Sequence, residues 1–126
     1  MLASIAAIAT GATLGALLRW ALALRLNAVF PALPLGTLAA NLVGGYAIGL
    51  AVAWLSQHPE LPPQWRLFLV TGLLGGLTTF STFSAEVVAQ LERGDFGWAL
   101  ATAGLHLFGS LALTALGIAT VRALSA

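Results

Sequence analysis

Hydrophobic residues dominate four long segments of the chain, and polar residues and prolines gather in the short breaks between them. The segments cover about residues 2–24, 35–55, 67–91 and 98–124. Each has roughly the 20 residues that a helix needs to cross about 30 Å of hydrocarbon. Prolines and clustered polar residues in the breaks are typical of helix ends. The pattern therefore predicts an all-α integral membrane protein, a single domain over residues 1–126 with four transmembrane helices.

The composition supports a membrane environment. Of the 126 residues, 60% are hydrophobic and only 7% are charged, and the mean hydropathy is +0.98. A soluble domain carries about 25% charged residues, so this chain would lack the residues to cover a wet surface. A net charge of +1 provides no basic patch for nucleic acid. The chain has no cysteine, and the spans offer no set of residues for an enzyme active site.

The arginines give almost no signal for orientation. Four spans place both chain ends on one side, together with Arg66 and Arg122, whereas Arg25 and Arg93 lie on the other side and Arg19 lies near the end of the first span. The positive-inside rule needs a bias between the two sides. We therefore infer dual topology, in which two opposed copies form an antiparallel homodimer, since two-fold dimers are the commonest assembly. Alternatively, a short chain with few arginines lacks the bias by chance.

The third segment contains a stretch that an ordinary transmembrane helix avoids, Gly75–Ser84. Two adjacent glycines come first, and five hydroxyl residues then fall within seven positions, interleaved with Phe80 and Phe83. Lipid satisfies neither a freed carbonyl nor a row of hydroxyls, so we predict a break in the third helix that faces protein or a water-filled path. The two rings share a face if the helix resumes there. Their positive edges would contact an anion, although packing is the commoner role of a membrane phenylalanine.

Polar residues recur every four positions in the fourth segment, which places them along one helix face. They are Thr102, His106, Ser110 and Thr114. Such a stripe predicts a track of hydrogen-bonding groups that lines a path. In the alternative, the hydroxyls bond to the carbonyl four residues earlier and His106 is a satisfied packing residue. Asn41, which lies near Thr37 in the second segment, either offers its NH2 group to an anion or joins two helices.

Two charged side chains lie within the segments. Glu86 is in the second half of the third segment, where a carboxylate is costly unless it is paired or hydrated. It carries protons, bonds to a helix end or lies near the membrane interface. Arg19 either snorkels to the headgroups or concentrates anions at a vestibule.

Three pairs of glycines are spaced four residues apart within the segments. They are Gly11 with Gly15, Gly45 with Gly49, and Gly72 with Gly76. Such pairs let helix backbones approach closely in lipid. We interpret them as ordinary packing contacts.

With these residues in view, the chain resembles the CrcB/Fluc family of fluoride channels over essentially its whole length. The most specific motif is Gly75-Gly76-Leu77-Thr78-Thr79-Phe80-Ser81-Thr82-Phe83-Ser84, followed by Glu86. Supporting motifs are Gly11-Ala12-x-x-Gly15-Ala16-x-x-Arg19-Trp20, Gly36-Thr37-Leu38-x-x-Asn41 and Gly109-Ser110. The resemblance implies a passive, fluoride-selective channel that exports cytoplasmic fluoride across the cell (inner) membrane. It also implies two pores in an antiparallel, dual-topology homodimer.

The resemblance implies roles for individual residues as well. The ring edges of Phe80 and Phe83 would line the pores, and Asn41 would donate its amide to the ion. The other implied pathway residues are Ser110 and Thr114 in the polar track, Thr37 near one end, His106, Ser81 and Thr82, with Arg19 at a vestibule. Backbone carbonyls of Gly75 and Thr78 from both subunits would hold a structural sodium ion at the dimer centre.

Two other functions compete with a channel. A small multidrug-type proton-coupled exporter would share the size, the span count and the dual topology. It needs an essential carboxylate early in the chain, however, and the first segment has no acid, which leaves Glu86 as the only candidate. A structural or assembly subunit without transport would not need hydroxyls, an amide and ring edges on one path.

Overall fold

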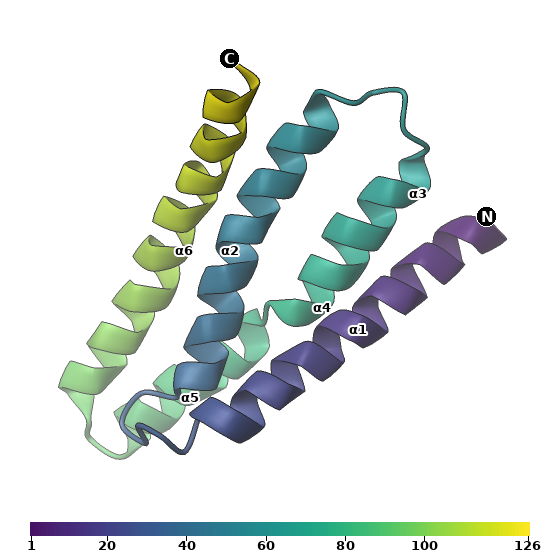
Figure 1. The fold of residues 1–126 in the computed structure, drawn as a ribbon. Coiled ribbons are helices and arrows are strands. Elements are labelled where there is room, and N and C mark those ends of the chain that lie inside the picture. Colours follow the sequence, from purple (N-terminus) through teal and green to yellow (C-terminus); the bar gives the residue numbers. More distant parts are fainter.

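The computed structural model describes residues 1–126 and contains four long helical segments, the third of which is broken (Figure 1). The unbroken segments are α1 (Leu2–Leu26), α2 (Leu35–Ser56) and α6 (Phe96–Ser125). The broken segment comprises α3 (Pro63–Arg66), the π-helix η1 (Leu67–Leu74), α4 (Gly75–Leu77) and α5 (Phe80–Glu92). All four segments are long and apolar enough to cross a membrane. The four predicted spans and the break in the third are therefore confirmed.

The helices form two packed pairs that meet at the break. Helix α2 lies along α6, and α1 lies along η1 and α4, while α5 turns back against α6 (Figure 1). Both chain ends lie toward the top of Figure 1, as an even number of crossings requires. The break therefore lies between α4 and α5, where the third segment passes α2.

Glycines bring helix backbones into direct contact. A Cβ atom added at Gly15 of α1 would meet the carbonyl oxygen of Leu73 and lie 2.7 Å from the nitrogen of Leu77. One added at Gly76 would lie 2.6 Å from the carbonyl oxygen of Ala12. The glycine pair on α2 packs against the backbone of α6 in the same way. The three glycine pairs are thus close-packing positions, as the sequence interpretation held.

A tight turn joins α5 to α6. Gly94 adopts a φ of 79°, which glycine tolerates far better than other residues. Its N–H donates to the carbonyl of Leu91 at 3.0 Å, and the N–H of Asp95 donates to the carbonyl of Gln90 at 2.9 Å. This pair of bonds is the Schellman motif that ends many helices. The turn folds α5 back on α6, so that Gln90 donates to the hydroxyl of Thr102 at 2.9 Å.

The π-helix η1 is the one element that the sequence pattern did not predict. An apolar run such as Leu67–Leu74 has the same hydrophobic character on all sides, so it does not distinguish a π-helix from an α-helix. π-Helical turns are rare in proteins, and those that do occur are often found at functional sites. Here η1 leads directly into α4 and the break, and the N–H of Thr78 makes the last bond, to the carbonyl of Leu74 at 3.0 Å.

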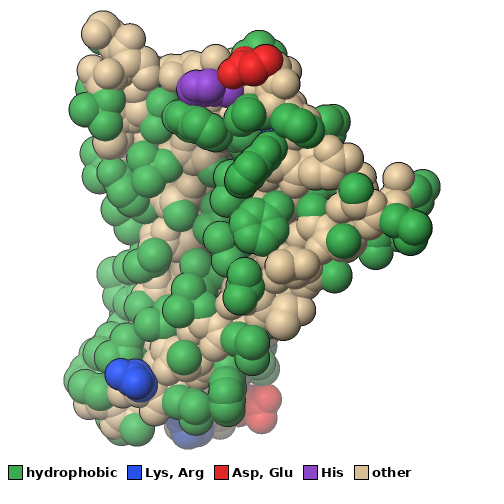
Figure 2. Space-filling model, turned by 45° about the vertical axis from the view of Figure 1, so that its right-hand side comes forward, with side chains coloured by type: hydrophobic (Ala, Val, Ile, Leu, Met, Phe, Trp, Pro, Cys, Tyr) green, Lys and Arg blue, Asp and Glu red, His purple; other side chains and the backbone are tan.

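The surface matches a protein that is immersed in lipid. Figure 2 shows hydrophobic side chains over the middle of the visible face, with charged side chains confined to its two ends. Large apolar residues such as Leu100, Phe108 and Leu111 are exposed along α6. A band of this kind is what the hydrocarbon region of a bilayer would cover.

Candidate functional site

The break consists of two residues in extended conformation, Thr78 (φ −82°, ψ 153°) and Thr79 (φ −147°, ψ 111°). The N–H of Thr79 donates to Oδ1 of Asn41 at 2.7 Å rather than to the carbonyl of Gly75, its partner in a continuous helix. The N–H of Thr82 donates to the hydroxyl of Thr79 at 3.1 Å rather than to the carbonyl of Thr78. The carbonyls of Gly75 and Thr78 thus lose their usual helical donors, while Thr79 caps the start of α5.

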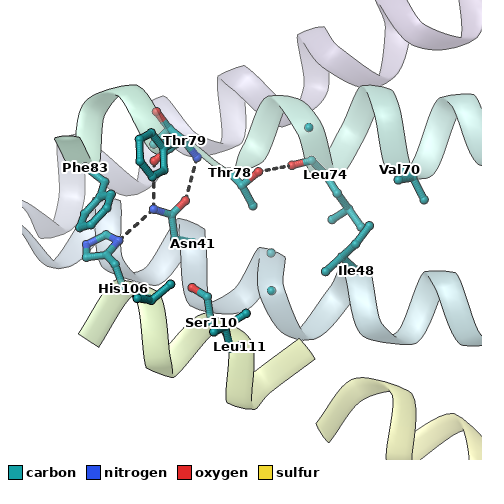
Figure 3. Close-up of a pocket in the computed structure, with 15 residues that line it drawn as sticks. Asn41, Ile48, Val70, Leu74, Thr78, Thr79, Phe83, His106, Ser110 and Leu111 are labelled. Carbon is teal, nitrogen blue, oxygen red and sulfur yellow. Dashed lines mark hydrogen bonds between the residues drawn. The ribbon is translucent and has the colours of Figure 1, made fainter. Parts of the chain in front are cut away.

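The side chain of Asn41 on α2 forms hydrogen bonds to the backbone of the break. Its Oδ1 accepts the N–H of Thr79, and its Nδ2 donates to the carbonyl of the same residue at 3.0 Å. The second hydrogen of Nδ2 points to Nδ1 of His106 on α6, at 2.9 Å (Figure 3). One side chain therefore links α2, the break and α6, and every hydrogen-bonding position that the amide uses lies within the protein.

Aromatic rings extend this cluster toward the surface. The ring of Phe83 stacks on that of His106, with centroids 4.5 Å apart and an interplanar angle of 26°. Phe80 meets Phe83 edge to face, with centroids 5.5 Å apart. Helix α5 begins at Phe80, so the two rings share a face as predicted. Phe80 is 79% exposed, and its ring therefore has one side free of the chain.

A cavity of about 390 Å³ opens beside these rings (Figure 3). Among its lining are several residues that the sequence singled out: Asn41, Gly75, Thr78, Phe80, Phe83, His106 and Ser110. The other predicted pathway residues lie outside this lining: Arg19, Thr37, Ser81, Thr82 and Thr114. The structure thus brings together the amide, the rings and the middle of the α6 stripe, but not the whole predicted set.

The polar stripe on α6 faces protein rather than lipid. Thr102 accepts from Gln90, His106 is bonded by Asn41, and Thr114 donates to the carbonyl of Gly45 at 2.8 Å. These partners lie on α2 and α5, so Thr114 does not bond back along its own helix as the alternative expected. Ser110 contributes its side chain to the cavity.

Glu86 bonds to a side chain in the first turn of α2, and Arg19 bonds to a backbone carbonyl near the break. The hydroxyl of Thr37, in the first turn of α2, donates to Oε2 of Glu86 at 2.6 Å. Nε of Arg19 donates to the carbonyl of Gly76 at 3.0 Å, just before the break. Arg19 therefore turns inward to a freed carbonyl at the negative end of a helix, where a cation is favourable, instead of snorkelling to the headgroups.

Three buried side-chain atoms have no hydrogen-bond partner within the chain: Oε1 of Glu86, Oε1 of Gln90 and Nε2 of His106. Gln90 is a residue to which the sequence interpretation gave no role. Its Nε2 also donates to the carbonyl of Ala32 at 2.9 Å, and the side chain is almost completely buried. An amide inside an apolar segment is the signal that would have identified it.

Comparisons with known proteins agree with this architecture. The family model described as CrcB-like protein, Camphor Resistance (CrcB), matches residues 6–118. A protein of Burkholderia cenocepacia named fluoride-specific ion channel FluC is 65% identical over 98% of this chain and 96% of the relative. Relatives of the same name from Burkholderia ambifaria and from Burkholderia pseudomallei are 62% and 60% identical over the same shares of both chains.

Proposed function

The chain belongs to the CrcB family of fluoride-specific ion channels, and we propose that it exports cytoplasmic fluoride passively through two pores in an antiparallel homodimer. It is a multi-pass membrane protein with four spans, and it is an ion channel rather than an enzyme. The observation that carries the proposal is the broken third span. The break is held by Asn41 beside a cavity that Phe80, Phe83 and Ser110 line.

The chemistry of the cavity suits a small, strongly hydrated anion. Such an ion leaves water only where many weak donors replace its hydration shell. A hydroxyl from Ser110 and the ring edges of Phe80 and Phe83 are donors of this kind. None of them carries a fixed positive charge that would trap the ion, and conduction requires binding that is favourable enough to enter and weak enough to leave.

The direction of transport follows from the membrane potential. Fluoride enters cells from an acidic medium as the neutral acid HF, which ionises at the higher pH of the cytoplasm. The anion is then trapped inside, where the negative potential favours its exit by about 2.3 kcal/mol per charge per 100 mV. A passive pore therefore suffices for export from a cell with an inside-negative inner membrane.

Exposure of Phe80 supports the antiparallel dimer. A phenylalanine ring beside an open, partly polar cavity is well placed to be covered by a second copy, so that each pore is completed across the subunit contact. The balanced arginines allow both orientations. Because the chain has no cysteine, one cysteine introduced at Ser125 would report topology. Half the copies labelled from each side of sealed vesicles would support the proposal, and labelling from one side alone would contradict it.

The two freed carbonyls support a structural sodium ion. Gly75 and Thr78 lack their helical donors, and both line the open cavity. Two such carbonyls from each subunit of an opposed pair provide four oxygens, and oxygen ligands suit a hard cation. A bound ion would neutralise the carbonyl dipoles and fix the two breaks against each other. Fluoride efflux that is unchanged after exhaustive replacement of sodium by a large organic cation would contradict this role.

Efflux from liposomes tests the proposed function. We expect vesicles that hold the purified protein to release fluoride rapidly when a potassium ionophore collapses the opposing potential, as a fluoride electrode would record. Matched vesicles loaded with chloride should show no release above that of protein-free vesicles. Absence of fluoride release from folded protein, or equal release of chloride, would reject a selective fluoride channel.

Substitution of Glu86 separates a channel from a proton-coupled exporter. Glu86→Gln removes the carboxylate that lies within the third span but keeps an oxygen that can accept the hydroxyl of Thr37. We expect the variant to keep fluoride efflux within about threefold of the wild type, because a change of this size corresponds to less than the roughly 1 kcal/mol of one hydrogen bond. Glu60→Gln in the loop after α2 is the control. Complete loss of transport in Glu86→Gln alone would favour the exporter.

A further inference from the structure

Two buried oxygens without a partner lie on the same face of α5. They are Oε1 of Glu86 and Oε1 of Gln90, and neither has a hydrogen-bond partner within the chain. Residues four apart on a helix are neighbours, with Cβ atoms about 5–6 Å apart, and long side chains lean toward the preceding turn. The side chain of Gln90 therefore extends along α5 toward Glu86. A buried acceptor without a donor is disfavoured, so this pair calls for an explanation.

The amide of Gln90 has only one possible orientation. Its Nε2 donates to the carbonyl of Ala32 at 2.9 Å and to the hydroxyl of Thr102 at 2.9 Å. A backbone carbonyl only accepts, so the nitrogen must lie on this side of the amide. Both hydrogens of Nε2 are then in use, and Oε1, on the other side, only accepts. Gln90 is 1% exposed, so bulk solvent does not reach this oxygen.

The carboxyl group of Glu86 also has one oxygen in use and one left over. Oε2 accepts the hydroxyl of Thr37 at 2.6 Å, whereas Oε1 is buried and unpaired. No cation lies against this group, since the single ion pair of the chain joins Arg93 and Asp95 at the exposed turn after α5. A buried carboxylate that lacks both a cation and a second hydrogen bond is costly to keep ionised.

The neighbouring helices bring no compensating charge to Glu86. Helix α5 packs mainly against α6 and α2. The only titratable side chain on α2 is Tyr46, and those on α6 are His106 and, in its last turn, Arg122. The loop between α1 and α2 has no charged residue, and Glu92 on α5 itself is exposed. The groups around the carboxyl thus offer hydrogen bonds but no positive charge.

A single added proton gives both oxygens a partner. A hydrogen on Oε1 of Glu86 can donate to Oε1 of Gln90, and no other group is then needed. A hydrogen on Oε2 would leave both Oε1 atoms without a partner. The existing bond does not change, because Oε2 of the neutral acid still accepts the hydroxyl of Thr37.

We propose that Glu86 binds a proton at neutral pH and that its carboxylic acid donates from Oε1 to Oε1 of Gln90. The proton assignment follows from the contacts alone, whereas its consequence for transport rests on the proposed function. A neutral acid adds no negative charge beside Thr37, which is a predicted residue of the anion pathway. Gln90 is the positioning residue, since Thr102 and the carbonyl of Ala32 fix its amide with the oxygen toward the acid.

Infrared spectroscopy of the purified protein tests the proton directly. The chain has only four acidic side chains, so a protonated one stands out in a detergent that has no carbonyl group. We expect a carboxylic-acid C=O band at neutral pH that is absent from Glu86→Gln. The control, Glu92→Gln, changes an exposed residue of the same helix and should keep the band. Absence of the band from the wild type would overturn the proposal and indicate an ionised Glu86 beside a bridging water.

A second measurement tests Gln90 as the acceptor in the unaltered chain. Carbon NMR of protein labelled in its glutamate and glutamine side chains should show the acid proton of Glu86 close to the side-chain amide carbon of Gln90. The other two glutamines, Gln57 and Gln64, lie outside α5 and should show no such proximity. An acid proton that is not close to the amide carbon of Gln90 would overturn the role of this residue.

Fluoride efflux at alkaline pH tests the consequence for transport. Loss of the proton would leave a negative charge beside the pathway, which repels an anion. We expect wild-type efflux to fall by about tenfold or more once the infrared band is lost at high pH, since repulsion between two like charges inside a protein readily reaches the size of a tenfold change. Glu86→Gln has no proton to lose at this site, so its efflux should stay constant over the same range.

The outcomes separate the proton from the channel. An equal fall in both proteins, or constant wild-type efflux after the band is lost, would overturn the consequence for transport. A band that persists at every accessible pH would support the proton assignment, and efflux should then be constant in both proteins. Absence of fluoride release from the folded wild type at neutral pH would reject the proposed function, while the infrared band would still decide whether Glu86 is protonated.

Discussion

Replacing Gly15 by alanine is expected to lower the free energy of unfolding by about 1–3 kcal/mol or more, the usual effect of overpacking a close contact. The added Cβ would meet the carbonyl oxygen of Leu73 and the nitrogen of Leu77, and these are backbone atoms that no rotamer change can move away. Helix α1 would have to shift from η1 and α4 along their shared length. The segments that lead into the break would then lose their close packing against α1.

Unfolding in mixed micelles, followed by circular dichroism as a denaturing detergent is added, measures this effect. Gly97→Ala is the matched control, since a Cβ there meets nothing within 4 Å and alanine is the better helix former by at most about 1 kcal/mol. Equal stability of the Gly15 and Gly97 variants would mean that α1 is not held as closely against the third span as described.

Asn41→Ala is expected to have the second large effect, because three groups would lose their partner at once. The N–H and the carbonyl of Thr79 and Nδ1 of His106 all bond to this amide. An unpaired buried group costs about 1–3 kcal/mol, so we expect a loss of several kcal/mol unless water enters the space. Fluoride efflux should fall to the level of protein-free vesicles, since the break that borders the proposed pathway loses its support.

The same unfolding titration, combined with fluoride efflux, checks this prediction. Thr13→Ala is the control, because the hydroxyl of Thr13 is exposed and only donates to the carbonyl of Ala9 on its own helix. Wild-type stability together with wild-type efflux in Asn41→Ala would contradict the bonding described for the break. Wild-type stability with lost efflux would show that water replaces the amide structurally but not functionally.

The sequence allowed the spans and the break to be predicted because both have local causes. Lipid requires long apolar segments, and the predicted second span, residues 35–55, differs from α2 by a single residue. Adjacent Gly75 and Gly76 followed by hydroxyls signal a break in any context. The turn at Gly94 is equally local, since it needs only a residue that tolerates positive φ.

The contacts across the break could not be predicted in the same way. That Asn41 bonds to Thr79, or that Arg19 reaches Gly76, depends on how far α1 and α2 slide along the third span, and no single segment encodes that register. The same reason explains why Ser81 and Thr82 lie outside the cavity lining although they belong to the most specific motif. Their roles, like that of Thr114, stay predictions.

The pairing of Asn41 with Thr79 has a wider consequence for how a membrane protein tolerates irregular backbone. The amide exchanges two hydrogen bonds with one extended residue, which is what an opposing residue does in an antiparallel β-ladder. The side chain of Asn41 thus makes the two hydrogen bonds that a residue of a neighbouring β-strand would make. Because a side chain makes them, no second extended segment is needed, and α2 continues unbroken from Leu35 to Ser56 beside the break. One asparagine on an intact helix is therefore enough to hold two extended residues between two helices of a membrane span.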